Sequence, residues 1–433
     1  MLWISLALAS VHEQQRLLPP EVPEPIVREA TPPGPPPQVW VYGYYAPWAG
    51  DLEDLDWARL THVAIFWVDL QSDGSVTDTS NWTKYGPKAM ELAEPHGVKV
   101  HLTLTCFDDD VMQSVLPSSS KRAKLVGELA DLVDAYGAHG VSVDCEGMSS
   151  GLKDDLVSLV SELKERVEEV TVATPAVDWN GAYDYDALAY AGDALFIMGY
   201  GYHWSNGDPG PVGPLYGGDP WSKYSLEWSV EDYRTWGAPD DRIILGLPLY
   251  GRDWPSTNTT VPGTATGEGS AVTMVEAIPE CEAIGRNYDS QTECAYCFPT
   301  STSQLWYDDH QSIEAKVAWA VDQELLGVGF WALNYEGGDP DFWDMMAEQT
   351  GAGEEQPQDT DSPGDSAPID DSGPGLDSDE EGGRGRAIGE REPIGSGCGS
   401  TPTQPGGWLL LGLVGLVTTR LRRRRVGYQN MSV

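Results

Sequence analysis

The chain has 433 residues, with 68 acidic and 26 basic side chains and a formal net charge of -42. This balance argues against nucleic acid as a partner, because phosphate binding needs a basic surface. Hydrophobic residues make up 40% of the chain, which allows a large core, whereas 48 glycines and 32 prolines indicate that part of the chain stays outside it.

The first 17 residues have features of an export signal. MLWISLALAS is a short apolar run that closes in small residues, although no Lys or Arg precedes it, and a misassigned start codon would explain the missing charge. Residues 18–38 contain PPEVPEP and TPPGPPP, which are typical of an extended, polyproline-like spacer without a fold of its own. We therefore expect an exported chain.

The C-terminal part has a different composition. Residues 349–396 are rich in Asp, Pro, Gly and Ser, which predicts a disordered acidic linker. Residues 397–433 contain Cys398, an apolar run that is short for a bilayer span, and a cluster of arginines. This combination resembles the myxobacterial sorting signals called MYXO-CTERM, which implies processing near Cys398 and display at the bacterial cell surface. A plain anchor helix is the alternative, and both predict membrane contact.

Between residues 39 and 348, short β-branched or aromatic runs alternate with helical stretches. The predicted strands are 39–45, 62–68, 98–105, 140–146, 170–176, 194–200, 242–249 and 327–333. Most are apolar on both faces, as buried parallel strands are, and eight such alternations predict an α/β fold of the (β/α)8 TIM-barrel type. A polar insertion at about 252–305 separates the last two strands. A doubly wound sheet is the alternative, but no glycine-rich phosphate turn follows the first strand.

Six cysteines in an exported chain permit disulfides without specifying them. Cys281, Cys294 and Cys297 lie in the insertion, where one pair could form and leave one thiol. Cys294-x-x-Cys297 lacks the second ligand pair of a structural zinc site, and Cys106 and Cys145 are expected to be buried thiols. Neither a metal nor an organic cofactor is indicated by a ligand cluster or a phosphate-binding loop.

The fourth predicted strand carries Ser142, Asp144 and Glu146 on one face, because strand side chains alternate. In a barrel this face leads to the mouth, where active sites lie. Two acids this close titrate as a coupled unit with one pKa raised, which suits a general acid.

Aromatic residues accompany the other predicted strand ends and form a rim around the acids. They are Tyr44, Tyr45, Trp48, Phe66, Trp67, Tyr200, Tyr202, Trp204, Tyr250, Trp254, Trp331 and Tyr335. So many aromatic rings at one rim are typical of a groove that stacks on sugars. An acidic pair inside such a groove predicts a glycosidase.

The motif HGVSVDCE at 139–146 resembles the DGxDxDxE signature of glycoside hydrolase family 18, the chitinase-like family, and is nearest its spore-cortex and peptidoglycan-associated branch. Matching segments include MGYGYHW at 198–204 and GVGFWALNYE at 327–336, and the resemblance covers nearly all of 39–347. It implies a retaining, substrate-assisted hydrolase that acts on β-linked N-acetylglucosamine polymers, either chitin-like or peptidoglycan glycan.

The resemblance also implies residue roles. Glu146 would protonate the glycosidic oxygen, and Asp144 would support the substrate's N-acetyl group, whose carbonyl oxygen attacks the anomeric carbon. Tyr200 would hydrogen-bond this group, and Trp331 would lie under the reacting sugar. Further substrate contacts are expected from Met198, Tyr44, Tyr202, Trp67 and Ser142.

Three positions depart from the family pattern, since His139, Ser142 and Gly201 each replace an aspartate. Ser142 can hydrogen-bond Asp144 but cannot exchange a proton as a carboxylate does. We expect slower turnover or altered substrate choice, and a structural role for His139. The alternative function is a surface lectin that binds the same glycans without cutting them. Glu146 favours the enzyme, because it supplies the proton.

Overall fold

The computed structural model describes residues 10–26 and 31–353, which fall in one compact unit, Met1–Asp359. The predicted sorting segment with Cys398, nearly all of the predicted acidic linker and the first nine residues lie outside the described residues. No helix in the described part of the chain combines the length and apolar character of a membrane span.

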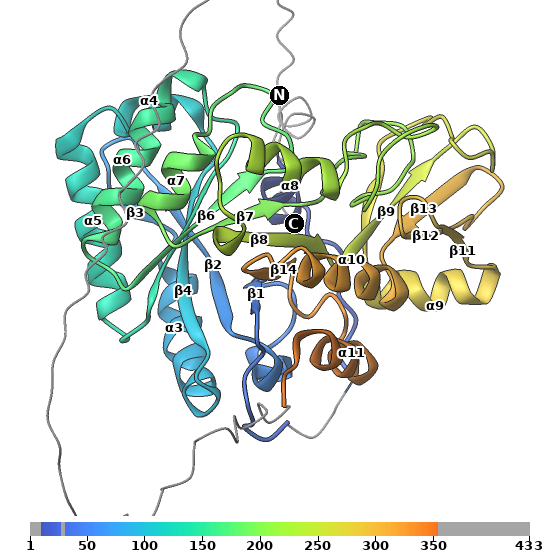
Figure 1. Ribbon diagram of the computed structural model, residues 1–433, viewed down its shortest axis with the longest axis horizontal. Coiled ribbons are helices and arrows are strands. Elements are labelled where there is room, and N and C mark those ends of the chain that lie inside the picture. Colours follow the sequence, from blue (N-terminus) through green and yellow to red (C-terminus); the bar gives the residue numbers. More distant parts are fainter. Residues whose placement is uncertain (1–9, 27–30, 354–433) are drawn as a thin grey trace, which may run out of the picture. The chain divides into compact units, whose positions relative to one another are not determined.

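Eight parallel strands close into a barrel, as predicted (Figure 1). β1 (Trp40–Tyr45) pairs with both β2 (His62–Leu70) and β14 (Gly327–Trp331), which joins the two edges of the sheet. The other parallel strands are β4 (Lys99–Cys106), β5 (Gly140–Cys145), β6 (Glu169–Pro175), β7 (Ala194–Met198) and β8 (Ile243–Pro248). The short β3 (Val76–Thr77) is an antiparallel partner of β2.

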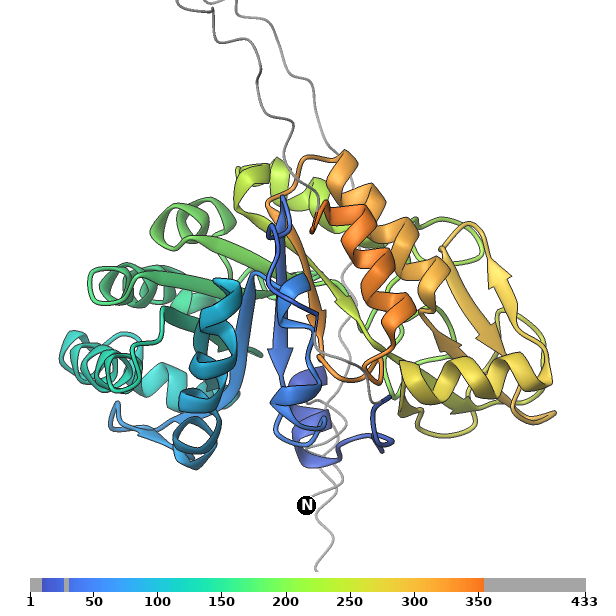
Figure 2. The ribbon, with the colours of Figure 1, turned by 90° about the horizontal axis from the view of Figure 1, so that it is seen from below.

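Helices follow the strands and cover the outside of the barrel (Figures 1 and 2). They are α3 (Ser80–Ala93), α4 (Asp109–Val115), α5 (Ser119–Asp134), α6 (Lys153–Lys164), α7 (Tyr185–Ala191), α8 (Leu226–Thr235), α10 (His310–Asp322) and α11 (Pro340–Thr350). Short 3-10 turns occur at Leu52–Asp54, Trp57–Arg59, Glu94–His96, Ser150–Leu152 and Asp240–Arg242. In α6 the buried residues Leu156, Leu159, Val160 and Leu163 recur at helical spacing and face the sheet.

Two glycines make room for an aromatic ring inside the barrel. A Cβ atom at Gly246 of β8 or Gly329 of β14 would lie 2.4 Å from the ring of Phe196. The ring of Phe196 in turn packs edge-on against Tyr44, with the ring centroids 5.0 Å apart. The glycines therefore set the position of Tyr44, which lies below the mouth of the barrel.

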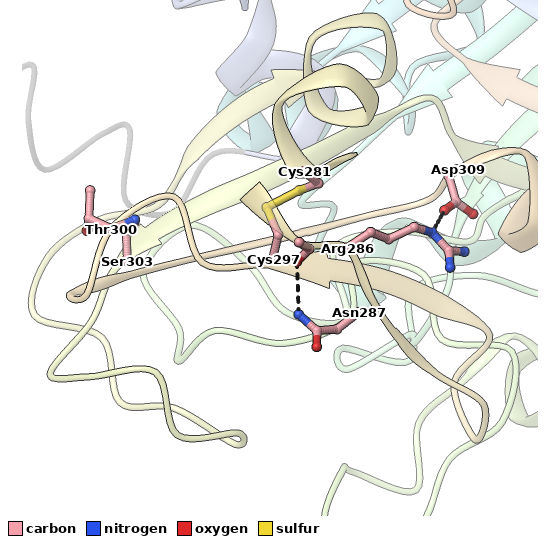
Figure 3. The surroundings of a disulfide bond; sticks show 8 residues. Cys281, Arg286, Asn287, Cys297, Thr300, Ser303 and Asp309 are labelled. Atoms are coloured by element: carbon pink, nitrogen blue, oxygen red, sulfur yellow. Dashed lines mark hydrogen bonds and ion pairs between the residues drawn. A yellow bond between two sulfur atoms is a disulfide. The ribbon is translucent and has the colours of Figure 1, made fainter. Parts of the chain in front are cut away.

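The predicted insertion lies between β8 and β14 and forms an antiparallel sheet with its own helix (Figure 1). Its elements are β9 (Tyr250–Pro255), β10 (Ser270–Thr273), α9 (Met274–Ile284), β11 (Asn287–Asp289), β12 (Cys294–Cys297) and β13 (Ser303–Tyr307). A disulfide between Cys281 and Cys297 joins α9 to β12 (Figure 3). Cys294 remains a buried thiol, as do Cys106 and Cys145.

The N-terminal segment contains a helix that the sequence did not indicate. Residues assigned to the export signal form α2 (Val11–Leu17), which begins after Ser10, whose hydroxyl accepts the amide of Glu13. Residues 18–26 and 31–38 form neither helix nor strand, but the amides of Ile26 and Gln38 donate to the carbonyls of Gly337 and Thr350 at 2.9 and 2.8 Å. α2 is the short dark-blue helix at one end of the barrel in Figure 2.

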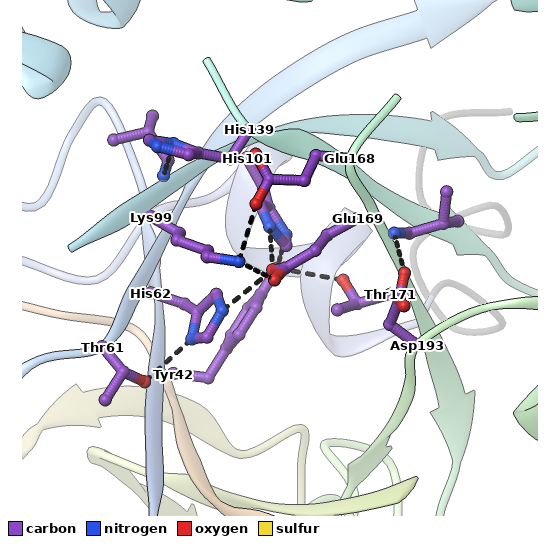
Figure 4. A network of polar contacts seen from close by, with 12 residues as sticks. Tyr42, Thr61, His62, Lys99, His101, His139, Glu168, Glu169, Thr171 and Asp193 are labelled. Carbon is purple, nitrogen blue, oxygen red and sulfur yellow. Dashed lines mark hydrogen bonds and ion pairs between the residues drawn. The ribbon is translucent and has the colours of Figure 1, made fainter. Parts of the chain in front are cut away.

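At the opposite end, a buried carboxylate is surrounded by three nitrogen donors (Figure 4). Glu169 Oε2 lies 3.0 Å from His62 Nε2 and 3.1 Å from His101 Nε2, and its other oxygen accepts from Lys99. Burial alone would raise the pKa of Glu169, but these donors hold it well below its ordinary value. His139 also has the structural place expected of it, because its Nδ1 accepts the amide of Val100 at 3.0 Å.

The same network makes folding stability depend on pH. Burial lowers the pKa of His62 to about 4, from an ordinary value of 6.5. The folded chain therefore binds fewer protons at this site than the unfolded chain. The stabilisation is present above the unfolded pKa and is lost as the pH falls from about 6.5 towards 4.

We predict that Glu169→Gln lowers the free energy of unfolding by about 3 kcal/mol, because it removes the buried carboxylate that His62, His101 and Lys99 contact. The measurement is chemical denaturation at neutral pH. The matched control is Glu168→Gln, because Glu168 also pairs with Lys99 but its side chain is 60% exposed, and we expect a loss below about 1 kcal/mol there. Equal losses in the two variants would contradict the assigned network.

Candidate active site

β5 brings the predicted acidic pair to the mouth of the barrel. Asp144 is fully buried, and the side chain of Glu146, just beyond the strand end, is 11% exposed. The amide of Glu146 donates to the carbonyl of Cys106 on β4 at 3.0 Å, which fixes the backbone where the acids project. The side chains therefore stand at the carboxyl ends of the strands, where barrel enzymes place their chemistry.

Glu146 is a carboxylic acid at neutral pH. Its burial raises its pKa, and the negative charge of Asp144 raises it further, to about 8. His12 opposes this shift more weakly. A carboxyl group that still holds its proton near pH 7 can act as a general acid.

Ser142 lies one layer deeper than the acids and makes a different bond from the one expected. Its hydroxyl is fully buried and lies 2.8 Å from the hydroxyl of Tyr44, and Oδ1 of Asp144 has no hydrogen-bond partner among the described residues. The expected Ser142 to Asp144 bond is therefore absent. Ser142 and Tyr44 support the floor of the site from below.

Aromatic side chains from several strands form the walls around the acids. Trp331 of β14 is fully buried, and its ring packs edge-on against Phe66 of β2 with the centroids 4.9 Å apart. Tyr200 follows β7, and its hydroxyl points to the same place as Asp144, since one imidazole contacts both. The walls, together with helix α2 in the mouth, exclude water from Glu146, which explains its raised pKa.

A cavity of about 520 Å³ opens beside Glu146 towards the loops after β6 and β7. Met198 and Tyr202 line it, as the sequence indicated. Trp179 and Tyr224 also line it, with their rings 4.8 Å apart, and the sequence gave no sign of them because they lie on irregular loops. A second cavity, of about 460 Å³, lies towards the insertion and includes Arg252.

Helix α2 lies between these cavities and fills the centre of the mouth. His12 is fully buried, with Nδ1 2.7 Å from Asp144 Oδ2 and Nε2 2.6 Å from the Tyr200 hydroxyl. Its ring stacks on Trp331 with the centroids 3.9 Å apart. No catalytic motif in the sequence pointed to α2 as part of the site. A hydroxyl cap at Ser10 followed by a polar heptapeptide was the only local signal.

Trp67 lies at the edge of the site beside this helix. The guanidinium of Arg16 lies over its ring, 5.4 Å from the centroid, and bonds Asp69 at 2.6 Å. Asp69, at the carboxyl end of β2, was not among the predicted site residues, because a single acid in a polar strand end carries little signal.

Two clusters among the described residues bring together side chains of the kind that bind metals. One joins His12 with the acidic pair, and the other is the His62, His101 and Glu169 group. In the second cluster, the ammonium group of Lys99 contacts the carboxylate. A positive charge at this distance disfavours a cation, so the donor set fits a neutralised structural network better than a metal site.

The model of one protein family, Glycosyl hydrolases family 18, matches residues 40–336. The chain is 27% identical over 251 residues to the Bacillus subtilis protein YdhD, whose name describes it as a sporulation-specific glycosylase, with 55% of this chain covered. It is 24% identical over 264 residues to the cortical fragment-lytic enzyme of the same organism, with 56% of this chain covered. The chain spans 57% of the length of each relative.

A solved structure shows the same fold. A class V chitinase from Nicotiana tobaccum, in complex with NAG4, superposes with a TM-score of 0.66 at 18% identity. The superposition covers 73% of this chain and 100% of that protein.

We predict that Asp144→Asn lowers the pKa of Glu146, because the variant removes a negative charge and leaves the burial unchanged. The pKa should stay above the ordinary glutamate value of 4.5, since burial is the larger cause. Carboxyl carbon NMR titration measures it, with Glu146→Gln to assign the resonance. The variant Asp110→Asn, at an exposed position of α4, should leave the titration unchanged, and an unaltered pKa in Asp144→Asn would refute the coupling.

Proposed function

The chain belongs to glycosyl hydrolase family 18, and on this basis we propose that it is a glycosidase that cleaves β-linked N-acetylglucosamine polymers with retention of configuration. The observation that carries the proposal is the placement of Glu146 and Asp144 at one strand end, in a mouth walled by aromatic rings, where burial and the charge of Asp144 raise the pKa of Glu146 to about 8. A chitin-like polymer and the glycan of peptidoglycan both contain the required sugar.

In the proposed reaction, Glu146 donates its proton to the glycosidic oxygen as the bond to the anomeric carbon breaks. The carbonyl oxygen of the substrate's N-acetyl group forms the new bond to that carbon, so no protein nucleophile is needed. Glu146, now a carboxylate, then takes a proton from the water that opens the intermediate. This use of the substrate is an exception to the scheme with two catalytic carboxylates.

We propose that Asp144 and Tyr200 hold the N-acetyl group, because their polar atoms face the same point in the mouth. The carboxylate would accept its N–H, and the hydroxyl would donate to its carbonyl oxygen. A single ring, His12, already contacts both groups at 2.7 and 2.6 Å, so one small polar group can reach both. Trp331 offers a flat face beneath, on which that ring stacks.

Cavities on both sides of the acids suit a polymer that extends past the cleaved bond in both directions. For the whole chain we propose export, display on a bacterial envelope and membrane contact through residues 397–433. These last proposals rest on the sequence of the termini alone.

We predict that Glu146→Gln lowers kcat on N-acetylglucosamine oligomers and on purified peptidoglycan by at least about a hundredfold, because the amide has no proton to give. Reducing-end release measures this in a chain that also carries His12→Ala and Gln15→Ala, since these side chains fill the mouth. Glu168→Gln, at the far end of the barrel, is the control and should change kcat by less than about threefold.

The outcomes separate the enzyme from a lectin. Equal cutting by the Gln variant would remove Glu146 from the proposed role. If the parent chain binds the oligomers but releases no reducing ends from either substrate, the protein is a glycan-binding lectin and the enzyme proposal fails.

We further predict that Trp179→Ala raises KM for long oligomers between about two- and tenfold, because this 73% exposed ring lines the cavity beside Glu146. Initial rates on tetramers and hexamers measure the effect. Trp236→Ala is the matched control, since Trp236 is also exposed (64%) but lies at the end of α8, outside the cavity. A similar KM in both variants would exclude Trp179 from the binding groove.

A further inference from the structure

The segment around α2 occupies the position that the proposed substrate needs. His12 contacts Asp144, Tyr200 and the face of Trp331, which are the three groups assigned to the N-acetyl sugar. Its imidazole presents two nitrogen atoms on opposite edges of a flat ring, as the acetamide presents an N–H and a carbonyl oxygen. A sugar and His12 therefore cannot be bound at once.

A second side chain of the helix completes the occlusion. Oε1 of Gln15 accepts from the indole N–H of Trp331 at 2.8 Å and from the hydroxyl of Tyr335 at 2.9 Å. Both partners are fully buried, as is Gln15 itself at 2% exposure. Both polar groups of the wall that face Gln15 Oε1 are donors, whereas Nε2 of the same amide is buried without a hydrogen-bond partner among the described residues.

The rest of the helix fits the groove in shape and charge. The Arg16 guanidinium pairs with Asp69 on β2 and lies near the rings of Trp67 and Phe107. A Cβ atom at Gly201 would lie 3.4 Å from Val11. This is an ordinary van der Waals contact, so the helix packs closely on Gly201, whose positive φ of 76° is a conformation that favours glycine.

The helix also crosses the groove instead of extending one of its walls. Gln14 lines the cavity beside Glu146 and the cavity towards the insertion. A glycan that extends in both directions from the cleaved bond would have to pass through the volume of α2. The spacer behind the helix is accessible, since Leu18 and Ile26 are 65% and 52% exposed.

We propose that residues 10–18, which overlap the end of the predicted export signal, close the glycan site for as long as they remain attached to the chain, and that the enzyme becomes active when this inhibitory segment leaves. This inference rests on the proposed function. The proline-rich spacer keeps the segment at a high effective concentration, whereas a free seven-residue helix would be marginal in water. Cleavage of the exposed spacer by a protease would therefore open the site.

Protonation should strengthen the closure. Burial alone would lower the pKa of His12, but the Asp144 carboxylate, with Glu146 beside it, raises it above 6.5. The other polar group that faces the ring is the hydroxyl of Tyr200, and the remaining contacts are the rings of Tyr44, Phe66 and Trp331. The protonation of His12 therefore stabilises docking fully below pH 6.5, and this stabilisation is lost as the pH rises through the pKa of His12 in the docked segment.

The test uses the full chain with His12→Ala and Gln15→Ala together, and Leu17→Ala as the matched control on the exposed side of the helix. We expect kcat/KM for the N-acetylglucosamine tetramer to rise at least about tenfold in the double variant and to stay within about twofold in the control. The ratio to wild type should shrink as the pH rises. Equal kcat/KM in wild type and the double variant, with both active, would overturn the inhibition.

Hydrogen exchange of the amides of residues 11–17 gives a readout that does not depend on turnover. Protection in wild type and Leu17→Ala, with its loss in the double variant, is the expected result, and free exchange in wild type would overturn the docking. If the double variant neither cuts nor binds the tetramer or peptidoglycan, the proposed function fails. The exchange result then decides separately whether the segment closes the mouth.

Discussion

The structure of the site follows from one constraint, which is that two carboxyl groups project from the same buried strand end. Asp144 and Glu146 lie in a mouth from which aromatic side chains exclude water, so both cannot carry an uncompensated charge at low cost. The raised pKa of Glu146 removes one charge by keeping its proton. The remaining charge is compensated by His12, which comes from outside the barrel.

Each end of the barrel contains a buried carboxylate, and the charge of this carboxylate is compensated differently at the two ends. At one end, the charge of Glu169 is compensated by Lys99 of β4, and two imidazoles lie within hydrogen-bond distance of the same carboxylate, all on strands of the barrel. At the other end, the compensating group of Asp144 belongs to a helix connected only through the spacer. The first arrangement is permanent, because it is part of the strands, whereas the second can be removed without unfolding the barrel. The network around Glu169 is therefore structural, whereas access to the site around Asp144 depends on whether the helix is docked.

Much of the barrel could be predicted from the sequence, because each strand is a short apolar run and the acids alternate on one of them. The docking of α2 could not, since His12 and Asp144 are 132 residues apart and no local pattern links them. The same limit applies to Cys281 and Cys297, because three nearby cysteines allow more than one pairing and the antiparallel pairing of the insertion selects among them. The partner of Ser142 depends on where Phe196 sets the ring of Tyr44, which is a packing effect across strands.

The departures from the family pattern have a common physical explanation once the helix is included. At position 201 an aspartate would have added a negative charge to the cavity that Gly201 and Glu146 both line. At position 142 a hydroxyl group bonds Tyr44 and adds no charge beneath the acids. Both changes leave His12 as the ionisable partner that neutralises Asp144, so the charge balance of the closed site depends on the inhibitory segment. Because the site contains fewer acids, the single imidazole of His12 is enough to compensate its charge when the segment is docked.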